Sequence, residues 1–329
     1  MLDETYNTLL TAVGAFLDPR ERLSIYWMLA ALGIAIAYYS FVVHQNRAAG
    51  PAGLLKWLMP RQIIFHPSAM TDYVYFVVNR LLRAFVYLQV FTLVPWVNAY
   101  VLSGMIAIWG PMEWSVAPSL FWTLVVTLVI ALVMDFSLWF GHWIFHVVPE
   151  LWEFHKVHHS AEVMTPLTAA RMHPVEEIVD SLIASAAIGA IYATFTYTLG
   201  PAMLMVTLLE MNIIVVGFYV AAFNLRHSHV FLRYPSWLQH VFVSPAQHQI
   251  HHSRAPEHWN RNMGFIFAFW DWAAGTLVSP KHHMNIEFGL GTQEDGTWRG
   301  VRMLYLRPFV GAWARLQERL GKSRIHPGE

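Results

Sequence analysis

The chain has 329 residues, of which 56% are apolar and only 13% charged, and its mean hydropathy is +0.40. Soluble globular proteins carry roughly 25% charged residues, so this composition predicts a membrane domain whose surface largely faces lipid. A formal net charge of zero argues against a nucleic acid as partner, and the absence of cysteine excludes disulfides and thiolate metal ligands.

Apolar stretches of the length of a bilayer span, roughly 20 residues, follow one another along the chain. Residues 23–43 form the first predicted span, and the segment 44–61 after it carries basic residues but no acid. The positive-inside rule therefore places the N-terminus outside and this segment in the cytoplasm. Residues 73–109 predict either one span with an interfacial helix or a bent pair, because Arg80 and Arg83 interrupt the apolar run.

Three further spans are predicted at residues 120–140, 178–199 and 202–223. Gly200 and Pro201 separate the last two and predict a tight turn between two helices.

The segments 140–177 and 224–261 are rich in histidine, arginine and lysine, and we expect them to be cytoplasmic. Together the elements predict an all-α fold, a polytopic membrane helical bundle with a cytoplasmic helical cap that holds a histidine-rich dimetal site. The expected regions are an N-terminal transmembrane region (1–119), a catalytic domain (120–278) and a polar C-terminal tail (279–329).

Histidine is the outlier of the composition, with 18 residues. His142 and His146 are four residues apart, so on a helix they share one face and can bind one metal. Two H-x2-H-H boxes follow, formed by His155, His158 and His159, and by His248, His251 and His252. Adjacent histidines on a helix point about 100° apart and can serve different metals.

Three such boxes beside predicted spans indicate a metal centre built from imidazoles. Eight or more histidines suit two metals better than one catalytic zinc, which needs only three protein ligands. Imidazole suits zinc, copper, iron and nickel alike, so spacing alone leaves iron and zinc as alternatives.

Six segments around the boxes occur in order: DFSLWFGHWIFH (135–146), LWEFHKVHHS (151–160), RMHP (171–174), HQIHHS (248–253), NMG (262–264) and WDWAAGT (270–276). In order and spacing they resemble the fatty acid hydroxylase/sterol desaturase superfamily. The resemblance covers residues 120–277 and implies a di-iron monooxygenase or desaturase that uses O2 and two external electrons on a C–H bond of a lipid.

The resemblance also implies which residues hold the metals: the three boxes and further histidines between the second and the third. The predicted ligands are His142, His146, His155, His158, His159, His173, His227, His248, His251 and His252. His173 precedes Pro174 and has an alternative role as the cap of the following helix. His229 stands where relatives often carry asparagine or an acid, and we expect it to support a ligand rather than bind metal.

Two kinds of charged residue near the boxes also receive predictions. Asp135 lies two helical turns before His142 and is expected either to accept a hydrogen bond from a ligand imidazole or to contact a neighbouring span. Arg171 and Arg226 are expected to meet lipid phosphates or to be surface charge.

By the same resemblance the cofactor is a pair of iron ions, with zinc as an alternative occupant of purified material, and O2 is the co-substrate. The sequence has no G-x-G-x-x-G motif and no P-loop, so a ferredoxin or a cytochrome b5-like protein is the expected electron donor. The expected substrate is a lipid from the bilayer, first a polar lipid or aminolipid, with a sterol desaturase or C4-methyl oxidase as the alternative. We expect a multi-pass protein of a bacterial inner membrane with its metal site on the cytoplasmic side.

Two rival classes are a zinc-dependent hydrolase and a metal transporter. The zincin motif H-E-x-x-H needs a glutamate that His142-Trp-Ile-Phe-His146 lacks. A transporter would line its spans with histidines on both sides of the membrane, whereas here they cluster on one predicted side. Both classes are therefore disfavoured.

Overall fold

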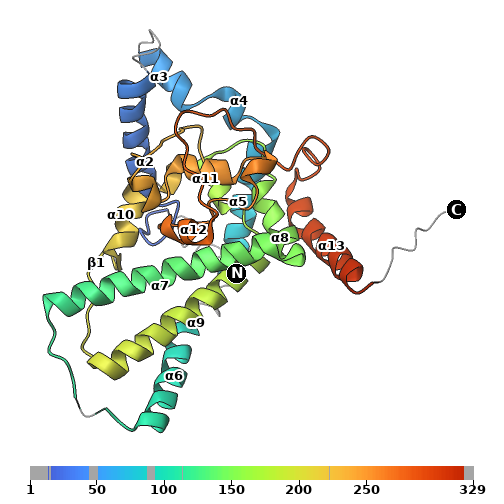
Figure 1. The fold of residues 1–329 in the computed structure, drawn as a ribbon. Coiled ribbons are helices and arrows are strands. Elements are labelled where there is room, and N and C mark those ends of the chain that lie inside the picture. Colours follow the sequence, from blue (N-terminus) through green and yellow to red (C-terminus); the bar gives the residue numbers. More distant parts are fainter. Residues whose placement is uncertain are drawn as a thin grey trace, which may run out of the picture.

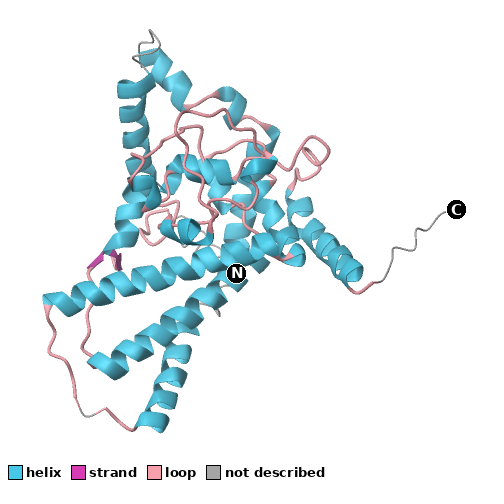
Figure 2. Cartoon of the chain, viewed as in Figure 1, coloured by secondary structure: helices cyan, strands magenta, loops and turns pink. Residues whose placement is uncertain are grey.

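The computed structural model of the protein describes residues 14, 16–43, 51–86, 93–112, 114–221 and 223–321. Helices make up nearly all of the regular structure (Figure 2). Within the described residues, two short strands, β1 (Thr207–Leu208) and β2 (Met211–Asn212), form one antiparallel hairpin. The prediction of an all-α fold is confirmed.

The N-terminal region contains a run of helices that ends before the first histidine box. They are α2 (Ile25–Tyr38), its π-helical continuation η1 (Tyr39–Val43), α3 (Pro51–Leu58), α4 (Arg61–Ile64), α5 (Pro67–Val86) and α6 (Leu93–Trp109). Residues 73–109 thus form parts of two separate helices, and the connection at 87–92 lies outside the described residues.

The histidine-rich part alternates long helices with short turns. Its elements are α7 (Leu120–Val147), α8 (Pro149–His159), η4 (Pro166–Ala170), α9 (Pro174–Leu199), α10 (Ile213–Ala221), η5 (Phe223–Leu225), η6 (Leu238–His240), α11 (Pro245–His251), η7 (Pro256–His258) and α12 (Phe269–Ala274). The C-terminal helix α13 (Val301–Arg319) packs against α8.

Three described helices are long and apolar enough to cross a membrane: Ile25–Val43, Leu120–Val147 and Pro174–Leu199. The second and third of these, α7 and α9, run beside each other, and α6 packs on α9 (Figure 1). The first one, α2 with η1, packs instead against α10 and η5. The chain therefore has the helices of a multi-pass membrane protein, with α7 and α9 leading into the histidine boxes.

The predicted span at residues 202–223 is wrong. The helix α9 ends at Gly200, which has a φ of 99°, and the chain then runs into the β1–β2 hairpin before a short helix begins at Ile213. Asn212 stabilises this break, because its Nδ2 donates to the Thr127 carbonyl of α7 at 2.8 Å and its Oδ1 accepts from the Ile214 N–H at 2.9 Å. An apolar composition alone does not reveal such a side-chain cap.

The packing of α6 on α9 depends on Gly189. A Cβ at this position would lie 2.7 Å from Val97 Cβ and 2.9 Å from the Val94 carbonyl oxygen of α6. Small residues at such contacts let two membrane helices approach closely.

We therefore expect Gly189→Ala to push α6 away from α9 and to lower the free energy of unfolding by about 1–3 kcal/mol. The measurement is thermal unfolding of the detergent-solubilised protein. Gly104→Ala is the matched control, since a Cβ on this α6 glycine meets nothing within 4 Å, and alanine favours a helix by roughly 0.5–1 kcal/mol. Equal destabilisation by both substitutions would show that the glycine at 189 has no packing role.

Candidate metal centre

Four segments of the chain bring nine of the ten predicted ligands together in two adjacent groups. The five-histidine group contains His142, His146, His155, His159 and His251, and the four-histidine group contains His158, His227, His248 and His252. Within each group the candidate ligand atoms all lie within 4.8 Å of one another. The histidines come from α7, α8, the turn after η5, and the end of α11.

The two H-x2-H-H boxes supply their histidines crosswise. In each box the first and last residues, four apart, share one group, as His155 and His159 do. The middle histidine of each box belongs to the other group, so His158 lies in the four-histidine group and His251 in the five-histidine group. The groups touch where the rings of His159 and His252 stack with centroids 4.6 Å apart.

Acceptors surround the five-histidine group and orient its rings. The Nδ1 atoms of His142 and His251 face the carbonyl oxygens of Met263 and Arg261, at 2.9 and 2.8 Å. Nδ1 of His155 lies 2.7 Å from Oε1 of the buried Glu176. His146 completes the pattern, with Nδ1 3.2 Å from the side-chain oxygen of Asn260.

These partners decide which nitrogen of each ring is free. A carbonyl oxygen only accepts, so Nδ1 of His142 and of His251 carries the hydrogen, and Nε2 of each neutral ring presents a bare lone pair. Nε2 of His142 lies 3.1 Å from Nε2 of His155. The buried Nε2 atoms of His146 and His251 have no hydrogen-bond partner among the described residues.

Converging lone pairs repel unless a cation lies between them. Nitrogens bound to one metal at about 2.1 Å are about 3.0–3.4 Å apart, a range close to the Nε2–Nε2 contacts of 3.0–3.2 Å in both groups. The donor set is neutral imidazole, the form that binds metals. The five-histidine group therefore fits a metal, and in the other group His158, His227 and His252 can supply three imidazole lone pairs.

Burial keeps these imidazoles in their neutral form. Desolvation lowers the pKa of His158 to about 3, with neighbouring charges adding to the effect. Burial, followed by the neighbouring imidazoles, also lowers the pKa of His159 and of His252 well below the usual value. Protons therefore compete poorly for these nitrogens near neutral pH, and a metal meets bare ligands.

The four-histidine group has different surroundings. The buried Nδ1 atoms of His158, His227 and His252 have no hydrogen-bond partner among the described residues. Nδ1 of His248 lies 2.6 Å from a guanidinium nitrogen of Arg226, which can only donate. Arg226 is itself buried, and two further hydrogen bonds tie it to the carbonyls of Phe265 and Gly264.

The segment that carries the Met263 carbonyl is held by two buried acids. Asp271 accepts from the backbone N–H groups of Met263 and Gly264, at 3.0 and 2.7 Å. Asp135 accepts from the N–H groups of Ile266 and Phe267, at 2.6 and 3.0 Å, and from the indole of Trp270. The predicted hydrogen bond from an imidazole to Asp135 is therefore corrected: this acid positions the backbone that in turn accepts from His142.

His173 lies outside both groups. Its Nδ1 accepts from the Val175 N–H at 3.1 Å, so it caps α9, and its Nε2 lies 3.2 Å from the Tyr305 carbonyl. Both ring nitrogens are thus engaged by backbone. The predicted ligand role is corrected to the capping alternative.

His229 also lies outside both groups. Its ring packs edge-on against Trp57, with centroids 5.0 Å apart, rather than against a ligand histidine. It lines a separate cavity of about 440 Å³ together with His66 and Glu162.

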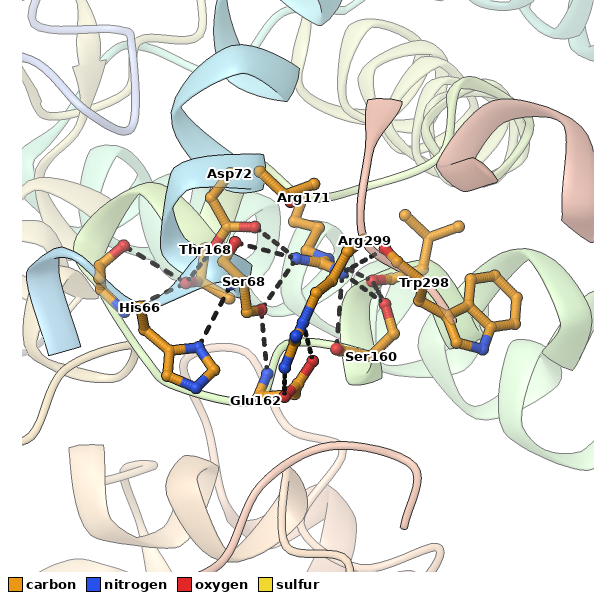
Figure 3. Close-up of polar contacts among 12 residues, drawn as sticks. His66, Ser68, Asp72, Ser160, Glu162, Thr168, Arg171, Trp298 and Arg299 are labelled. Carbon is orange, nitrogen blue, oxygen red and sulfur yellow. Dashed lines mark hydrogen bonds and ion pairs between the residues drawn. The ribbon is translucent and has the colours of Figure 1, made fainter. Parts of the chain in front are cut away.

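Arg171 closes a buried hydrogen-bond network at the end of α8 (Figure 3). Its guanidinium donates to Asp72 of α5 at 2.7 Å, to the Val157 carbonyl at 2.9 Å and to the Ser160 hydroxyl at 2.8 Å. It also donates to the carbonyl of Trp298, close to α13, at 3.2 Å. Val157 and Ser160 flank His158 and His159, so this network positions the second histidine box.

The prediction that Arg171 and Arg226 meet lipid phosphates or are surface charges is wrong. Arg171 is 1% and Arg226 3% exposed, so neither meets lipid phosphate nor is a surface charge. Sequence patterns do not predict the role of Asp72, because its partner Arg171 lies 99 residues away. The best available signal was an acid within an otherwise apolar helical run.

A cavity of about 390 Å³ opens onto the five-histidine group and is lined by His146, His159 and His251. Aromatic and charged side chains form much of the remaining wall: Trp152, Lys156, Arg254, Trp259 and Glu294. The five-histidine group thus borders a cavity with a polar and aromatic wall.

The family model described as fatty acid hydroxylase matches residues 127–276. This match confirms the resemblance to the fatty acid hydroxylase/sterol desaturase superfamily. No solved structure matches the chain. The matched segment contains all nine grouped histidines, together with Asp135, Glu176, Arg226 and Asp271.

Removing the acceptor at Glu176 is expected to weaken one metal position selectively. Glu176→Leu leaves Nδ1 of His155 without its partner, and loss of such partners lowers metal affinity about 10–100-fold. Glu176→Gln keeps an acceptor and should lose less. The measurement is metal per protein, by elemental mass spectrometry, after competition with a chelator. Release of both metals together, or of neither, would contradict this role.

Arg171→Met is expected to lower the free energy of unfolding by about 3–5 kcal/mol, because it leaves Asp72 charged, buried and unpaired. The double variant Arg171→Met/Asp72→Asn should recover part of that loss in thermal unfolding. Arg254→Met is the control: its ion pairs are more exposed and contribute about 0–1 kcal/mol. Equal stability of the single and double variants would show that the pair is not coupled.

Proposed function

Since residues 127–276 match the fatty acid hydroxylase family, we propose that the protein is an integral-membrane, non-haem di-iron oxygenase that hydroxylates a C–H bond of a lipid. The observation that carries the proposal is the convergence of five and four imidazole nitrogens on two adjacent points. Two irons bound there would activate O2 for C–H oxidation, chemistry for which the side chains have no redox group of their own.

Hydroxylation inserts one oxygen atom of O2 into the C–H bond and releases the other as water, with two electrons and two protons from outside. Removal of two hydrogens instead would give the desaturase alternative. The chain's own residues hold and orient the ligands: Glu176 and the Met263 carbonyl set two rings, and Asp135 holds the segment that carries Met263.

The cavity over the five-histidine group supports a polar lipid as substrate. Lys156, Arg254 and Glu294 in its wall suit a headgroup better than a sterol ring system, whose apolar faces need an apolar wall. Trp152 and Trp259 supply apolar area for the adjoining chain. We therefore favour a polar-lipid or aminolipid hydroxylase, with the sterol-type enzyme as the alternative.

The electrons are proposed to come from a separate protein, a ferredoxin or a cytochrome b5-like donor. We place the metals on the cytoplasmic side of a bacterial inner membrane. The basic residues of the segment 44–61 support this orientation through the positive-inside rule. The C-terminal end of α7 and the N-terminal end of α9 adjoin the same histidine cluster, so all the ligands gather at one end of these two helices.

The test compares protein loaded anaerobically with ferrous iron or with zinc, in vesicles of bacterial lipid with a reductant. Only the iron form should consume O2 and add the mass of one oxygen atom to a lipid. His251→Ala should abolish both signals, whereas His240→Ala, an exposed histidine outside the groups, should leave them unchanged. Lipid modification by the zinc form without reductant would overturn the proposal.

A further inference from the structure

The helix α13 carries a large exposed apolar face. Figure 1 shows it at the edge of the molecule beside α8. Val310 is 70%, Trp313 61% and Leu306 52% exposed. The exposed apolar residues of this helix are Met303, Leu306, Phe309, Val310, Trp313, Leu316 and Leu320.

These side chains share one side of the helix, where Arg302 in the first turn and Gln317 in the last interrupt them. At 100° per residue they fall within an arc of about 140°, wide enough for a helix to bury one side in an apolar medium. The arc contains no acidic residue. Soluble surfaces rarely carry so many large apolar side chains in one contiguous patch.

The opposite side of α13 is fixed to the metal-binding part of the protein. Leu304 is fully buried, and Tyr305 packs on Tyr75 of α5 with ring centroids 4.9 Å apart. Arg315 donates to Glu153 of α8 at 3.2 Å, and a Cβ on Gly311 would contact the same carboxylate. The helix therefore cannot turn its apolar face inward without breaking these contacts.

Basic residues border the apolar arc. Helical spacing puts Arg307 about 40° beyond one edge of the arc and Arg319 about 60° beyond the other, while Arg302 falls within it at the first turn; α13 contains four arginines but one glutamate. Arg319 is 73% exposed. A basic amphipathic helix with tryptophan on its apolar face is typical of helices that lie in the headgroup region of a bilayer.

The neighbouring helix α5 also exposes an apolar stripe. Met70, Val74, Val77 and Leu81 recur at helical spacing on one side of α5 and are 42–56% exposed. The buried sides of α5 and α13 meet through Tyr75, Tyr305 and Asn79. Two helices in contact thus both expose apolar stripes, in a protein with helices of spanning length.

We propose that α13 lies in the plane of the bilayer surface, with its apolar arc among the acyl chains and with Arg307 and Arg319, which flank the arc, near anionic lipid phosphates. This surface lies outside the matched segment 127–276 and does not depend on the reaction proposed above. Because α13 packs on α8, the second histidine box is held one helix diameter from the lipid surface, about 8–10 Å between axes.

A second copy of the chain fits this face less well. A symmetric contact would bring the same basic edges of α13 together, and like charges at an interface oppose association. Lipid phosphates instead complement them.

The absence of cysteine makes a direct test clean, because single cysteines can carry a nitroxide label at chosen positions. The full-length protein is labelled at Val310→Cys, in the arc, or at Glu318→Cys, on the polar side of the same helix. It is placed in vesicles of phosphatidylethanolamine and phosphatidylglycerol. Collisions of each label with oxygen, which concentrates in lipid, and with an aqueous nickel chelate are then measured by spin resonance.

We expect the ratio of oxygen collisions to nickel collisions to be at least several-fold higher for the label at 310 than for the label at 318. A label at Leu124→Cys, on the exposed side of α7, serves as the reference for a position that faces lipid. Equal access of nickel to positions 310 and 318 would overturn the proposal. Dipolar broadening between labels at 310 that persists at high lipid dilution would also overturn it, in favour of a second copy.

Discussion

The arrangement of the two histidine groups depends on one electrostatic constraint: bare imidazole lone pairs must point at each other across about 3 Å. Such a cluster repels itself until a cation occupies it, so the surrounding protein has to hold the rings in place. Acceptors on Nδ1 do this for His142, His155 and His251, because each hydrogen bond determines both the tautomer and the direction of the ring. The segment that carries the accepting Met263 carbonyl is itself held by the buried acids Asp135 and Asp271.

The support extends beyond the segment that matches the family. Arg171 ties the end of α8 to Asp72 on α5 and to the Trp298 carbonyl near α13, both outside residues 127–276. A buried ion pair of this kind gives little net stability, but removing one partner is costly. The N-terminal helices and the C-terminal segment therefore act as parts of the metal-binding scaffold, through contacts with the loop that follows the second histidine box.

The sequence predicted the features that repeat locally. The spacing of the boxes and the apolar length of α7 and α9 are properties of single helices, and periodicity reveals them. The sequence-based prediction failed where the role of a side chain depends on a partner far away in the chain. The Asp135 carboxylate has its first partner 131 residues away, and the acid that pairs with Arg171 lies 99 residues away. His173 is a cap because Pro174 begins a helix there. The span at 202–223 was predicted wrongly because an apolar composition does not reveal the hydrogen bond from Asn212 to α7.

The two histidine groups differ in the charge of the side chains that surround them. The five-histidine group has the carboxylate of Glu176 on one ring, whereas the four-histidine group has the guanidinium of Arg226 on His248. A cation in the first group is stabilised by a nearby negative charge, and a cation in the second is opposed by a positive one. All nine side chains that converge in the two groups are imidazoles, with no carboxylate among them. Two bound metals would therefore keep nearly all of their charge in a buried site. Such surroundings favour the lower oxidation state of each ion, because every further positive charge would have to be held at low effective dielectric.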